Sequence, residues 1–336
     1  MKKKILLIAT GGTIASKQGE NGLTPMITAG EMLSYVPQVR ELCDIETMSP
    51  VSLDSTNVRA ADWQSMAGEI EKNYDKFDGF VICHGTDTMA YTAAALSYMV
   101  ENSPKPIVIT GAQRPIDSEI TDAKTNLADS IAFACEPRAH GVVIVFDGKV
   151  IAGTRAKKQR TKSYNAFSSI NFPEIAVIRE GRTVFFIDDK NENEQVRFAK
   201  KLCDKVFLLK LIPSCSAQIL RMISGEYRGV LIESFGLGGL PDYDGKGEFF
   251  AALREFTDKG GVAVICTQVP GEGSDMTIYE VGQKVRRAQN VIEAYDMTIE
   301  AAVTKLMWLL GQYDDFDDIE RGFYKEINHD ILMAKI

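Results

Sequence analysis

Short apolar runs alternate along the first half of the chain with longer segments of helical periodicity. The apolar runs are the length of strands buried on both faces, and they occupy residues 5–9, 80–83, 106–110 and 142–146. Segments with helical spacing or helix-forming composition lie between them, at residues 29–36, 60–74, from Met89 onward and at 126–134. Strands separated by helices are typical of βαβ units, so this half of the chain predicts a parallel sheet.

Three of these strands run directly into small polar turns. The sequences are I-A-T-G-G-T, I-C-H-G-T-D and V-I-T-G-A-Q, and each places glycine and threonine just past a buried strand. The carboxyl ends of parallel strands share one sheet edge, where ligands bind in open α/β sheets. An alternative for the second turn is a plain helix cap, in which Thr86 or Asp87 closes free N–H groups. The three turns together favour a shared crevice.

The pattern changes after residue 146. Asp147-Gly148 stands between two β-prone runs and predicts a hairpin, with a return strand at residues 150–153. The next segment, residues 155–162, is polar, carries five cations and has no apolar periodicity. A solvated loop is the plain interpretation of such a charge run. One more strand is predicted at residues 184–187.

An acidic, hydrophilic stretch at residues 188–195 then indicates a boundary between domains. Beyond it a second βα series appears, with strands at 206–211, 229–232 and 262–267, helices at 216–224 and 249–259, and a final helix containing residues 299–310. We therefore expect two α/β domains. The larger N-terminal one, residues 1–187, has a parallel sheet with a β-hairpin, and the smaller C-terminal one, residues 206–336, is a flavodoxin-like α/β domain. Residues 188–205 would link them.

Composition narrows the function classes. The chain has 336 residues, a net charge of −8 and a pI near 5.2, which argues against a broad nucleic-acid surface. No apolar stretch approaches the ~20 residues of a membrane span, and the opening apolar run is shorter than the ~7–15 residues of a signal-peptide core. Six cysteines without a C-x-x-C pair and three widely spaced histidines predict reduced thiols and no metal site. We expect a cytoplasmic protein that needs no cofactor.

The candidate nucleophiles are threonines. The chain has no G-x-S-x-G elbow and no cysteine with a suitable histidine partner, whereas Thr13 and Thr86 both lie in glycine turns after buried strands. A threonine hydroxyl needs a neighbouring base, which Asp87 or a neutral lysine would supply. A free lysine titrates near ~10.4, so such a lysine must be desolvated or crowded by cations, as in segment 155–162. A phosphate-binding role is disfavoured because T-G-G-T-I-A fits neither nucleotide-binding glycine motif.

Two motifs together, T-G-G-T-I-A at residues 10–15 and H-G-T-D-T-M at 84–89, resemble the signatures of bacterial-type L-asparaginases. D-S-T-N at 54–57, G-T-R-A-x-K at 153–158 and S-F-G-x-G at 234–238 follow in the expected order, and the resemblance to the cytoplasmic type I branch covers the whole chain. The resemblance implies hydrolysis of L-asparagine to L-aspartate and ammonia, with weaker glutaminase activity. It also implies a homo-oligomer, either a dimer or a dimer of dimers.

The resemblance further implies roles for individual residues. Thr13 would attack the side-chain amide to form an acyl-enzyme. Thr86, Asp87 and Lys158 would form a second triad, in which Lys158 relays a proton through the Thr86 hydroxyl. Backbone N–H groups near Thr86 would hold the oxyanion.

Substrate contacts are implied in the same way. Ser55 and Thr56 would grip the α-carboxylate, Asp87 would also pair with the α-ammonium, and Gly12 and Gly85 would line the substrate. Asp275 is the candidate carboxylate donated across a dimer. The family's lid tyrosine is replaced here, since Leu23 falls at its position.

Two alternatives remain beside an asparaginase. The amidase subunit of a tRNA-dependent amidotransferase shares these motifs but resembles an asparaginase with an extra N-terminal barrel domain. A catalytically silent binder of a small amino acid is the other, suggested by Leu23 at the lid position.

Overall fold

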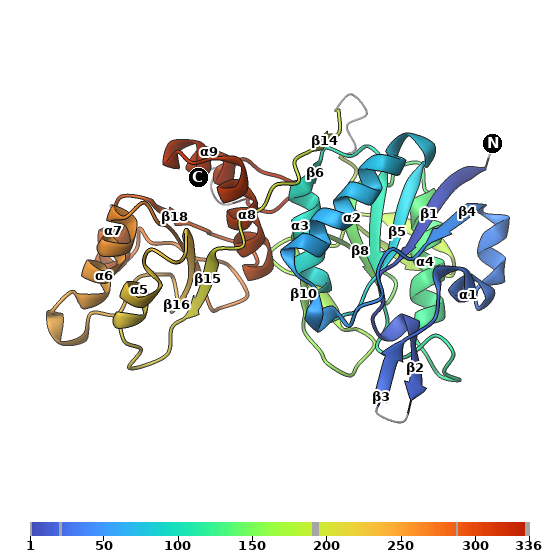
Figure 1. Cartoon of the computed structure of the whole chain (residues 1–336), viewed down its shortest axis with the longest axis horizontal. Coiled ribbons are helices and arrows are strands. Elements are labelled where there is room, and N and C mark those ends of the chain that lie inside the picture. The colour runs from blue at the N-terminus through green and yellow to red at the C-terminus, as the bar shows by residue number, and fades with distance from the viewer. Residues whose placement is uncertain (1, 20–21, 190–194, 287, 333–336) are drawn as a thin grey trace. The chain divides into compact units, whose positions relative to one another are not determined.

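The computed structural model describes residues 2–19, 22–189, 195–286 and 288–332 and divides into two compact units. The first is Met1–Lys200 and the second is Lys201–Ile336 (Figure 1). Each unit is an α/β layer structure of its own, as the alternation of apolar runs and helical segments predicts.

An eight-stranded sheet forms the centre of the first unit, in the order β13-β12-β9-β8-β7-β5-β1-β4. The five strands from β8 to β4 run parallel, and β9, β12 and β13 continue the sheet antiparallel. In that order the strands are Arg182–Phe185, Ala176–Arg179, Lys149–Ala152, Gly141–Phe146, Pro106–Thr110, Gly79–Cys83, Lys3–Ala9 and Cys43–Met48.

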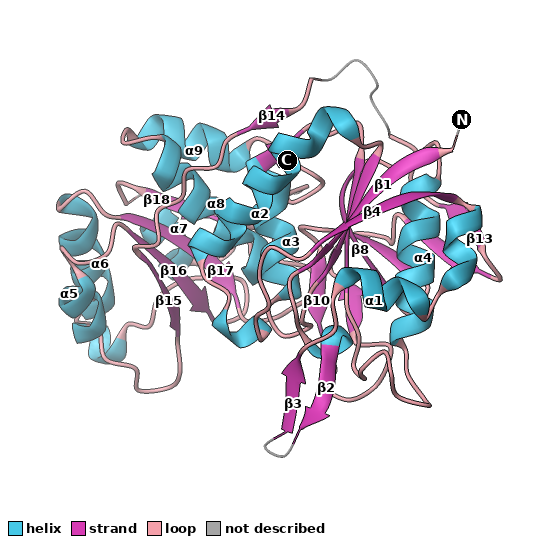
Figure 2. Cartoon of the chain, turned by 45° about the vertical axis from the view of Figure 1, so that its right-hand side comes forward, coloured by secondary structure: helices cyan, strands magenta, loops and turns pink. Residues whose placement is uncertain are grey.

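Helices cover both faces of this sheet, with α2 and α3 on one side and α1 and α4 on the other (Figure 2). The central strands β5 and β7 are buried along their whole length, which explains their unbroken apolar sequences. Leu127 and Ile131 of α4 pack in one cluster with Val81 and Val108 of the sheet. The helices are α1 (Ala29–Ser34), α2 (Ala60–Asn73), α3 (Met89–Met99) and α4 (Ala123–Cys135), with 3₁₀ turns at η1 (Thr13–Ala15), η2 (Pro37–Glu41), η3 (Ser55–Asn57) and η4 (Tyr74–Lys76).

The first unit also contains three two-stranded ribbons outside its main sheet. They pair β2 (Ser16–Gly19) with β3 (Gly22–Pro25), β6 (Val100–Glu101) with β14 (Arg197–Phe198), and β10 (Ala156–Lys158) with β11 (Phe167–Ser169). The third ribbon corrects the interpretation of residues 155–162 as a solvated loop, because the first half of that segment contains strand β10. Buried Ala156 and Phe167 anchor that ribbon, and such isolated apolar positions leave no periodicity in the sequence.

The second unit is built on a four-stranded parallel sheet in the order β15-β16-β17-β18. Phe249 and Phe256 of α6 pack with Val230 and Ile232 on one face, while Leu306 of α8 lies against Gly229 on the other. The elements are β15 (Val206–Lys210), α5 (Gln218–Ile223), β16 (Gly229–Ser234), η5 (Tyr243–Gly245), α6 (Glu248–Asp258), β17 (Val262–Thr267), α7 (Glu280–Arg286), β18 (Val291–Glu293), α8 (Ile299–Gln312) and α9 (Phe316–Tyr324).

The segment expected as a linker, residues 188–205, is only partly described, since residues 190–194 lie outside the described ranges. It contains β14, which pairs with β6 of the first unit. Domain boundaries at 187 and 206 stay predictions.

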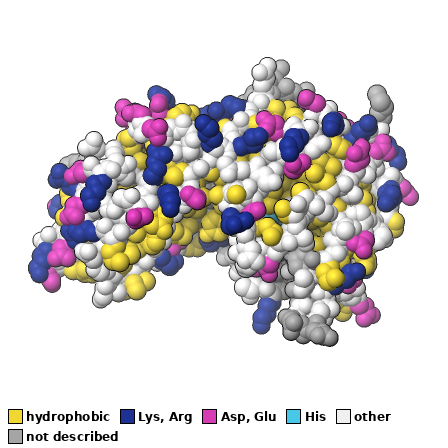
Figure 3. Space-filling view, in the orientation of Figure 1, with side chains coloured by type: hydrophobic (Ala, Val, Ile, Leu, Met, Phe, Trp, Pro, Cys, Tyr) yellow, Lys and Arg dark blue, Asp and Glu magenta, His cyan; other side chains and the backbone are white. Residues whose placement is uncertain are grey.

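Charges of both signs are interspersed over the face drawn in Figure 3, where lysines and arginines lie among aspartates and glutamates. In the part of the chain that the structure describes, no helix combines the length and the apolar character needed to cross a membrane.

Candidate active site

The three glycine–threonine turns meet at one edge of the first sheet, as the strand pattern predicts. Strands β1, β5 and β7 are parallel neighbours whose ends are in register, with Ala9 beside Cys83 and Cys83 beside Thr110. The backbone N–H and the hydroxyl of Thr10 both donate to the carbonyl of Cys83, each at 3.0 Å. The N–H of His84 donates to the carbonyl of Thr110 at 2.8 Å. The turns are therefore joined by backbone hydrogen bonds.

Gly12 and Gly85 bring the first two turns into direct backbone contact. A Cβ atom on Gly12 would lie 2.3 Å from both Cα and N of Gly85, and Gly12 has a φ of +77°, which glycine adopts without strain. A Cβ atom on Gly85 would lie 2.6 Å from the hydroxyl oxygen of Ser55. Because Gly12 and Gly85 have no Cβ atom, the three segments that carry Gly12, Gly85 and Ser55 can pack directly against one another.

Thr13 begins the 3₁₀ turn η1 and is half-buried. Its segment is fixed on both sides, because the N–H of Gly12 donates to the carbonyl of Leu53 at 2.9 Å and the hydroxyl of Ser16 donates to the carbonyl of Gly12 at 2.9 Å. The backbone that carries Thr13 is therefore held in place next to the turn that contains Gly85.

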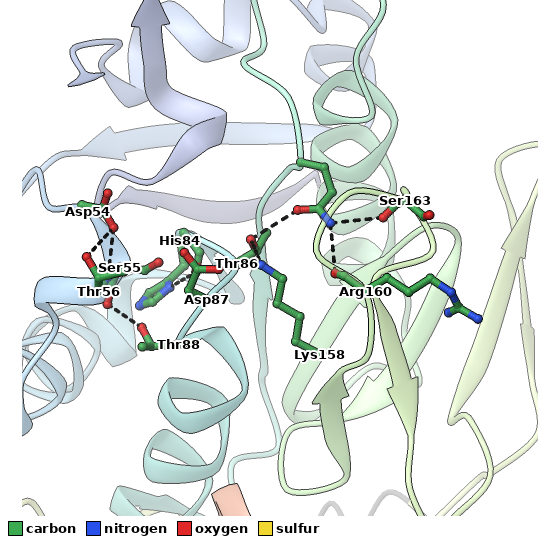
Figure 4. Close-up of polar contacts among 12 residues, drawn as sticks. Asp54, Ser55, Thr56, His84, Thr86, Asp87, Thr88, Lys158, Arg160 and Ser163 are labelled. Carbon is green, nitrogen blue, oxygen red and sulfur yellow. Dashed lines mark hydrogen bonds and ion pairs between the residues drawn. The ribbon is translucent and has the colours of Figure 1, made fainter. Parts of the chain in front are cut away.

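Lys158 joins Thr86 and Asp87 from a distant part of the sequence (Figure 4). Its Nζ atom donates to the hydroxyl oxygen of Thr86 at 2.8 Å and to Oδ1 of Asp87 at 2.7 Å. The side chain of Lys158 is 16% exposed and that of Asp87 is 58% exposed, while Thr86 is buried. The structure thus brings together three of the four predicted catalytic side chains in one network whose carboxylate end faces solvent.

Arg155 and Arg160, two of the cations near Lys158 in the sequence, have contacts of their own. Arg155 is fully buried with its guanidinium over the ring of Phe172, and Arg160 donates to the carbonyl of Asn165. That these cations crowd the amine of Lys158 stays a prediction. Its contacts are with Thr86 and with the carboxylate of Asp87.

Ser55 and Thr56 lie on η3, next to the Gly85 turn. Ser55 is buried, and its carbonyl accepts the hydroxyl of Thr88 at 2.8 Å, which ties η3 to the start of α3. The N–H and hydroxyl of Thr56 both donate to Oδ1 of Asp54 at 2.9 Å (Figure 4). This Asp54 turn explains the short D-S-T-N motif and presents two hydroxyl side chains at the same sheet edge.

Sequence reasoning missed Gln113, which follows the third turn. Its Oε1 accepts the hydroxyl of Thr86 at 3.5 Å, and its Nε2 donates to the carbonyls of Arg160 at 3.2 Å and Ser163 at 3.1 Å. Gln113 therefore connects Thr86 to the segment just after Lys158. The signal was present in the sequence, because V-I-T-G-A-Q repeats the strand-end pattern of the other two turns.

Asp122 holds the Gln113 segment in place. Its carboxylate accepts the N–H groups of Gln113 and Arg114 and the side-chain amide of Asn126. Burial raises the pKa of Asp122 above its usual value, although these hydrogen bonds oppose the shift.

The structure of a single chain does not test the predicted roles of two further residues, Asp275 and Leu23. Asp275 belongs to the second unit, where its Oδ1 accepts the N–H and hydroxyl of Thr277. Those hydrogen bonds lower the pKa of Asp275. The backbone of Leu23 pairs with Gln18 in the β2–β3 hairpin, whose residues 20–21 are outside the described ranges. Their roles stay predictions.

The groups gathered at this edge are two threonine hydroxyls, an amine, a carboxylate and the N–H groups at the start of α3. A hydroxyl nucleophile with an amine and donors for a developing oxyanion suits acyl transfer. No group of three histidine, cysteine, aspartate or glutamate side chains within the described ranges is arranged to hold a metal ion.

Comparison with known proteins shows the family of the chain. A model of the N-terminal domain of asparaginases matches residues 4–191, and a model of the glutaminase/asparaginase C-terminal domain matches residues 205–323. The chain belongs to the asparaginase family.

Relatives within the asparaginase family cover almost the whole chain. L-asparaginase of Thermococcus kodakarensis is 36% identical over 98% of this chain and 99% of its own, and its solved structure has a TM-score of 0.92 over the same shares. L-asparaginase 1 of Escherichia coli is 32% identical over 98% of both chains. A glutamyl-tRNA(Gln) amidotransferase subunit of Pyrococcus horikoshii is 34% identical over 94% of this chain and 74% of its own.

Proposed function

We propose that this protein hydrolyses L-asparagine to L-aspartate and ammonia through an acyl-enzyme on Thr13. The observation that carries the proposal is the contact of the Lys158 amine with both Thr86 and Asp87, at 2.8 and 2.7 Å, beside the turn that bears Thr13. Family membership supports it, as does the name of the T. kodakarensis relative.

The first half of the reaction forms the acyl-enzyme. The hydroxyl oxygen of Thr13 attacks the side-chain carbonyl carbon of asparagine and loses its proton to a base. The amide nitrogen of the tetrahedral intermediate then takes up a proton and leaves as ammonia, and an ester to Thr13 remains. N–H groups near Thr86 stabilise the oxyanion of that intermediate, a contribution of about 3–4 kcal/mol per donor in other acyl-transfer sites.

The second half hydrolyses the ester. A water molecule attacks the acyl carbon and gives a proton to Thr86, which passes its own proton to a neutral Lys158. A proton then returns from Lys158 along the same path to the Thr13 oxygen as it leaves, so that L-aspartate is released and the hydroxyl is restored. The relay needs a short, continuous path, and the Thr86–Lys158 contact of 2.8 Å provides one step of it. Asp87 fixes the amine in this position through the second hydrogen bond.

Substrate recognition rests on the hydroxyls of Ser55 and Thr56 for the α-carboxylate and on Asp87 for the α-ammonium. An amino-acid substrate brings two charges into the crevice, and unpaired buried charges cost several kcal/mol. Gly12 and Gly85 would line the substrate from the two turns that they bring into contact. Asp275, from the second unit of a neighbouring subunit in a dimer or dimer of dimers, would complete the site.

An assay of ammonia release from L-asparagine by the purified protein tests the proposal. We expect turnover of L-asparagine with weaker release from L-glutamine, in the absence of added cofactor. Folded protein that binds L-asparagine without releasing ammonia would identify an amino-acid binder instead.

A second function is the amidase part of a tRNA-dependent amidotransferase, favoured by the 34% identity to the amidotransferase relative from P. horikoshii. Affinity purification from cells that naturally express the protein distinguishes the two. An asparaginase retains full activity alone, whereas an amidase subunit copurifies with a second protein and depends on it and on tRNA. We place the enzyme in the cytoplasm, following its resemblance to the type I branch.

A further inference from the structure

His84 is a buried titratable group that the proposed mechanism does not use. It is 1% exposed and lies between strand β5 and the Gly85–Thr86 turn. Its Nδ1 atom is 2.7 Å from the carbonyl oxygen of Gly85, and its Nε2 atom is 3.0 Å from the hydroxyl oxygen of Thr92 on α3. The indole N–H of Trp63, on α2, reaches the same hydroxyl oxygen at 2.9 Å.

The partners of the ring determine where its proton lies. A carbonyl oxygen only accepts hydrogen bonds, so Nδ1 of His84 must carry a hydrogen and donate it to Gly85. The Trp63 N–H only donates, so the Thr92 oxygen accepts it and its own hydrogen is available for Nε2. Burial lowers the pKa of His84, which keeps the ring neutral near pH 7 and leaves Nε2 as the acceptor. In the series of hydrogen bonds from Trp63 through Thr92 and His84 to Gly85, every donor then faces an acceptor.

The bond to Gly85 fixes a peptide plane in the proposed active site. The structure has no cis peptide bond among its described residues, so the carbonyl of Gly85 and the N–H of Thr86 point to opposite edges of one plane. Because the carbonyl is held toward His84, the N–H of Thr86 points away from helices α2 and α3. Among the described residues, this N–H has no protein acceptor.

We infer that His84 is a positioning residue, which holds the Gly85–Thr86 peptide so that the N–H of Thr86 is directed at the oxyanion of the bound substrate. This inference rests on the proposed function. His84 itself contacts neither substrate nor the reacting atoms and acts only through the Gly85 carbonyl.

A matched pair of variants separates this role from simple packing. The amide nitrogen of asparagine stands as far along the side chain as Nδ1 of histidine, whereas the amide of glutamine reaches the position of Nε2. His84→Asn therefore keeps a donor for Gly85 and loses the partner of Thr92, and His84→Gln does the reverse. Each gives up one of the two hydrogen bonds, so both should unfold at a lower temperature than the wild type.

We expect kcat of His84→Asn on L-asparagine within about twofold of the wild type and kcat of His84→Gln lowered about threefold to tenfold at unchanged KM. The loss is smaller than the ~10²–10³-fold that follows removal of an oxyanion donor, because the N–H is misdirected rather than absent. Equal kcat values for the two variants, or a lower kcat for His84→Asn, would overturn the inference.

A second readout does not depend on activity. Nitrogen NMR of the wild type, with the His84 signals assigned by their loss in His84→Asn, should show Nδ1 protonated and Nε2 unprotonated at pH 7. The opposite tautomer would overturn the inference. Wild-type protein that hydrolyses neither L-asparagine nor L-glutamine would contradict the proposed function, and the role of His84 in it would fall too. If the wild type is active but kcat of His84→Asn is equal to or lower than that of His84→Gln, only the inference about His84 is contradicted.

Discussion

The amine nitrogen of Lys158 lies 2.8 Å from the hydroxyl oxygen of Thr86, although 72 positions separate the two residues in the sequence. Thr86 lies in the turn that follows the buried central strand β5, whereas Lys158 is the last residue of the short strand β10. The pairing of Lys158 with Phe167 in the β10–β11 ribbon, and the burial of Phe167, hold the lysine there. The proposed proton relay thus depends on a small ribbon outside the main sheet.

Replacing Lys158 with methionine should stop turnover without unfolding the protein. Lys158→Met keeps an unbranched side chain of similar length and removes the amine, so kcat on L-asparagine should fall at least ~100-fold, as for loss of a general acid or base. Lys162→Met, which removes an exposed cation of the same segment, is the matched control and should remain within about twofold. Equal activity of the two variants would exclude Lys158 from the relay.

The contact between Gly12 and Gly85 makes a prediction about stability. Gly12→Ala places a Cβ atom 2.3 Å from the Gly85 backbone at a φ of +77°, so we expect the free energy of unfolding to fall by roughly 2–4 kcal/mol and activity to be lost. Gly22→Ala is the control, because its φ is +113° but no atom lies within 4 Å of the added carbon. Gly22→Ala should lower the free energy of unfolding by only about 1 kcal/mol. Urea unfolding with equal losses for both variants would show that strain alone, and not the close contact, matters.

Asp129, on helix α4, should make stability depend on pH. Burial raises the pKa of Asp129 to about 6 from 3.8, although the positive charge of Arg179 opposes the shift. Between these two values the folded state binds more protons than the unfolded state, so the contribution of this group is fully present below pH 3.8 and is lost as pH rises through 6. The loss is about 3 kcal/mol at most.

Asp129→Asn carries no such titration and imitates the protonated acid. Urea unfolding should therefore show the variant close to the wild type at low pH and more stable than it above pH 7. A difference between the two proteins that stays constant across the pH range would contradict the assignment.

The second unit contains a buried ion pair. Nζ of Lys305 lies 2.6 Å from Oδ2 of Asp330, and both side chains are 0% exposed. Lys305→Met leaves the carboxylate buried without its counter-charge and should lower the free energy of unfolding by about 3–5 kcal/mol. Lys284→Met breaks the exposed ion pair with Glu280 and should change the free energy of unfolding by no more than about 1 kcal/mol. Thermal unfolding compares the two, and similar losses would show that burial of the first pair has no effect.

The strands that position the site could be predicted because their signal is local. Residues 80–83 and 106–110 are unbroken apolar runs that end in glycine turns, and parallel pairing then places those turns at one edge. The position of Thr86 and Asp87 at a strand-to-helix junction follows from the same pattern. The same pattern makes Thr13 a candidate nucleophile, whereas the choice of Lys158 among the cations of residues 155–162 rests on the family resemblance.

Other features depend on contacts that the sequence does not display. Strand β4 at the edge of the sheet is half-exposed and carries Asp44 and Glu46, so its pattern does not stand out as a strand. The link from Gln113 to residues 160–163 joins two loops and leaves no periodicity. The chain from Trp63 through Thr92 to His84 likewise spans three elements, and each residue alone looks like ordinary core.

The threonine acyl-enzyme is the central claim, and ammonia release from L-asparagine by the wild type, Thr13→Ala and Thr86→Val tests it most directly. We predict turnover by the wild type and a loss of at least ~100-fold in kcat for each variant, with unfolding temperatures within a few degrees of the wild type. A variant lacking the Thr13 hydroxyl that still released ammonia at near the wild-type rate would contradict the account.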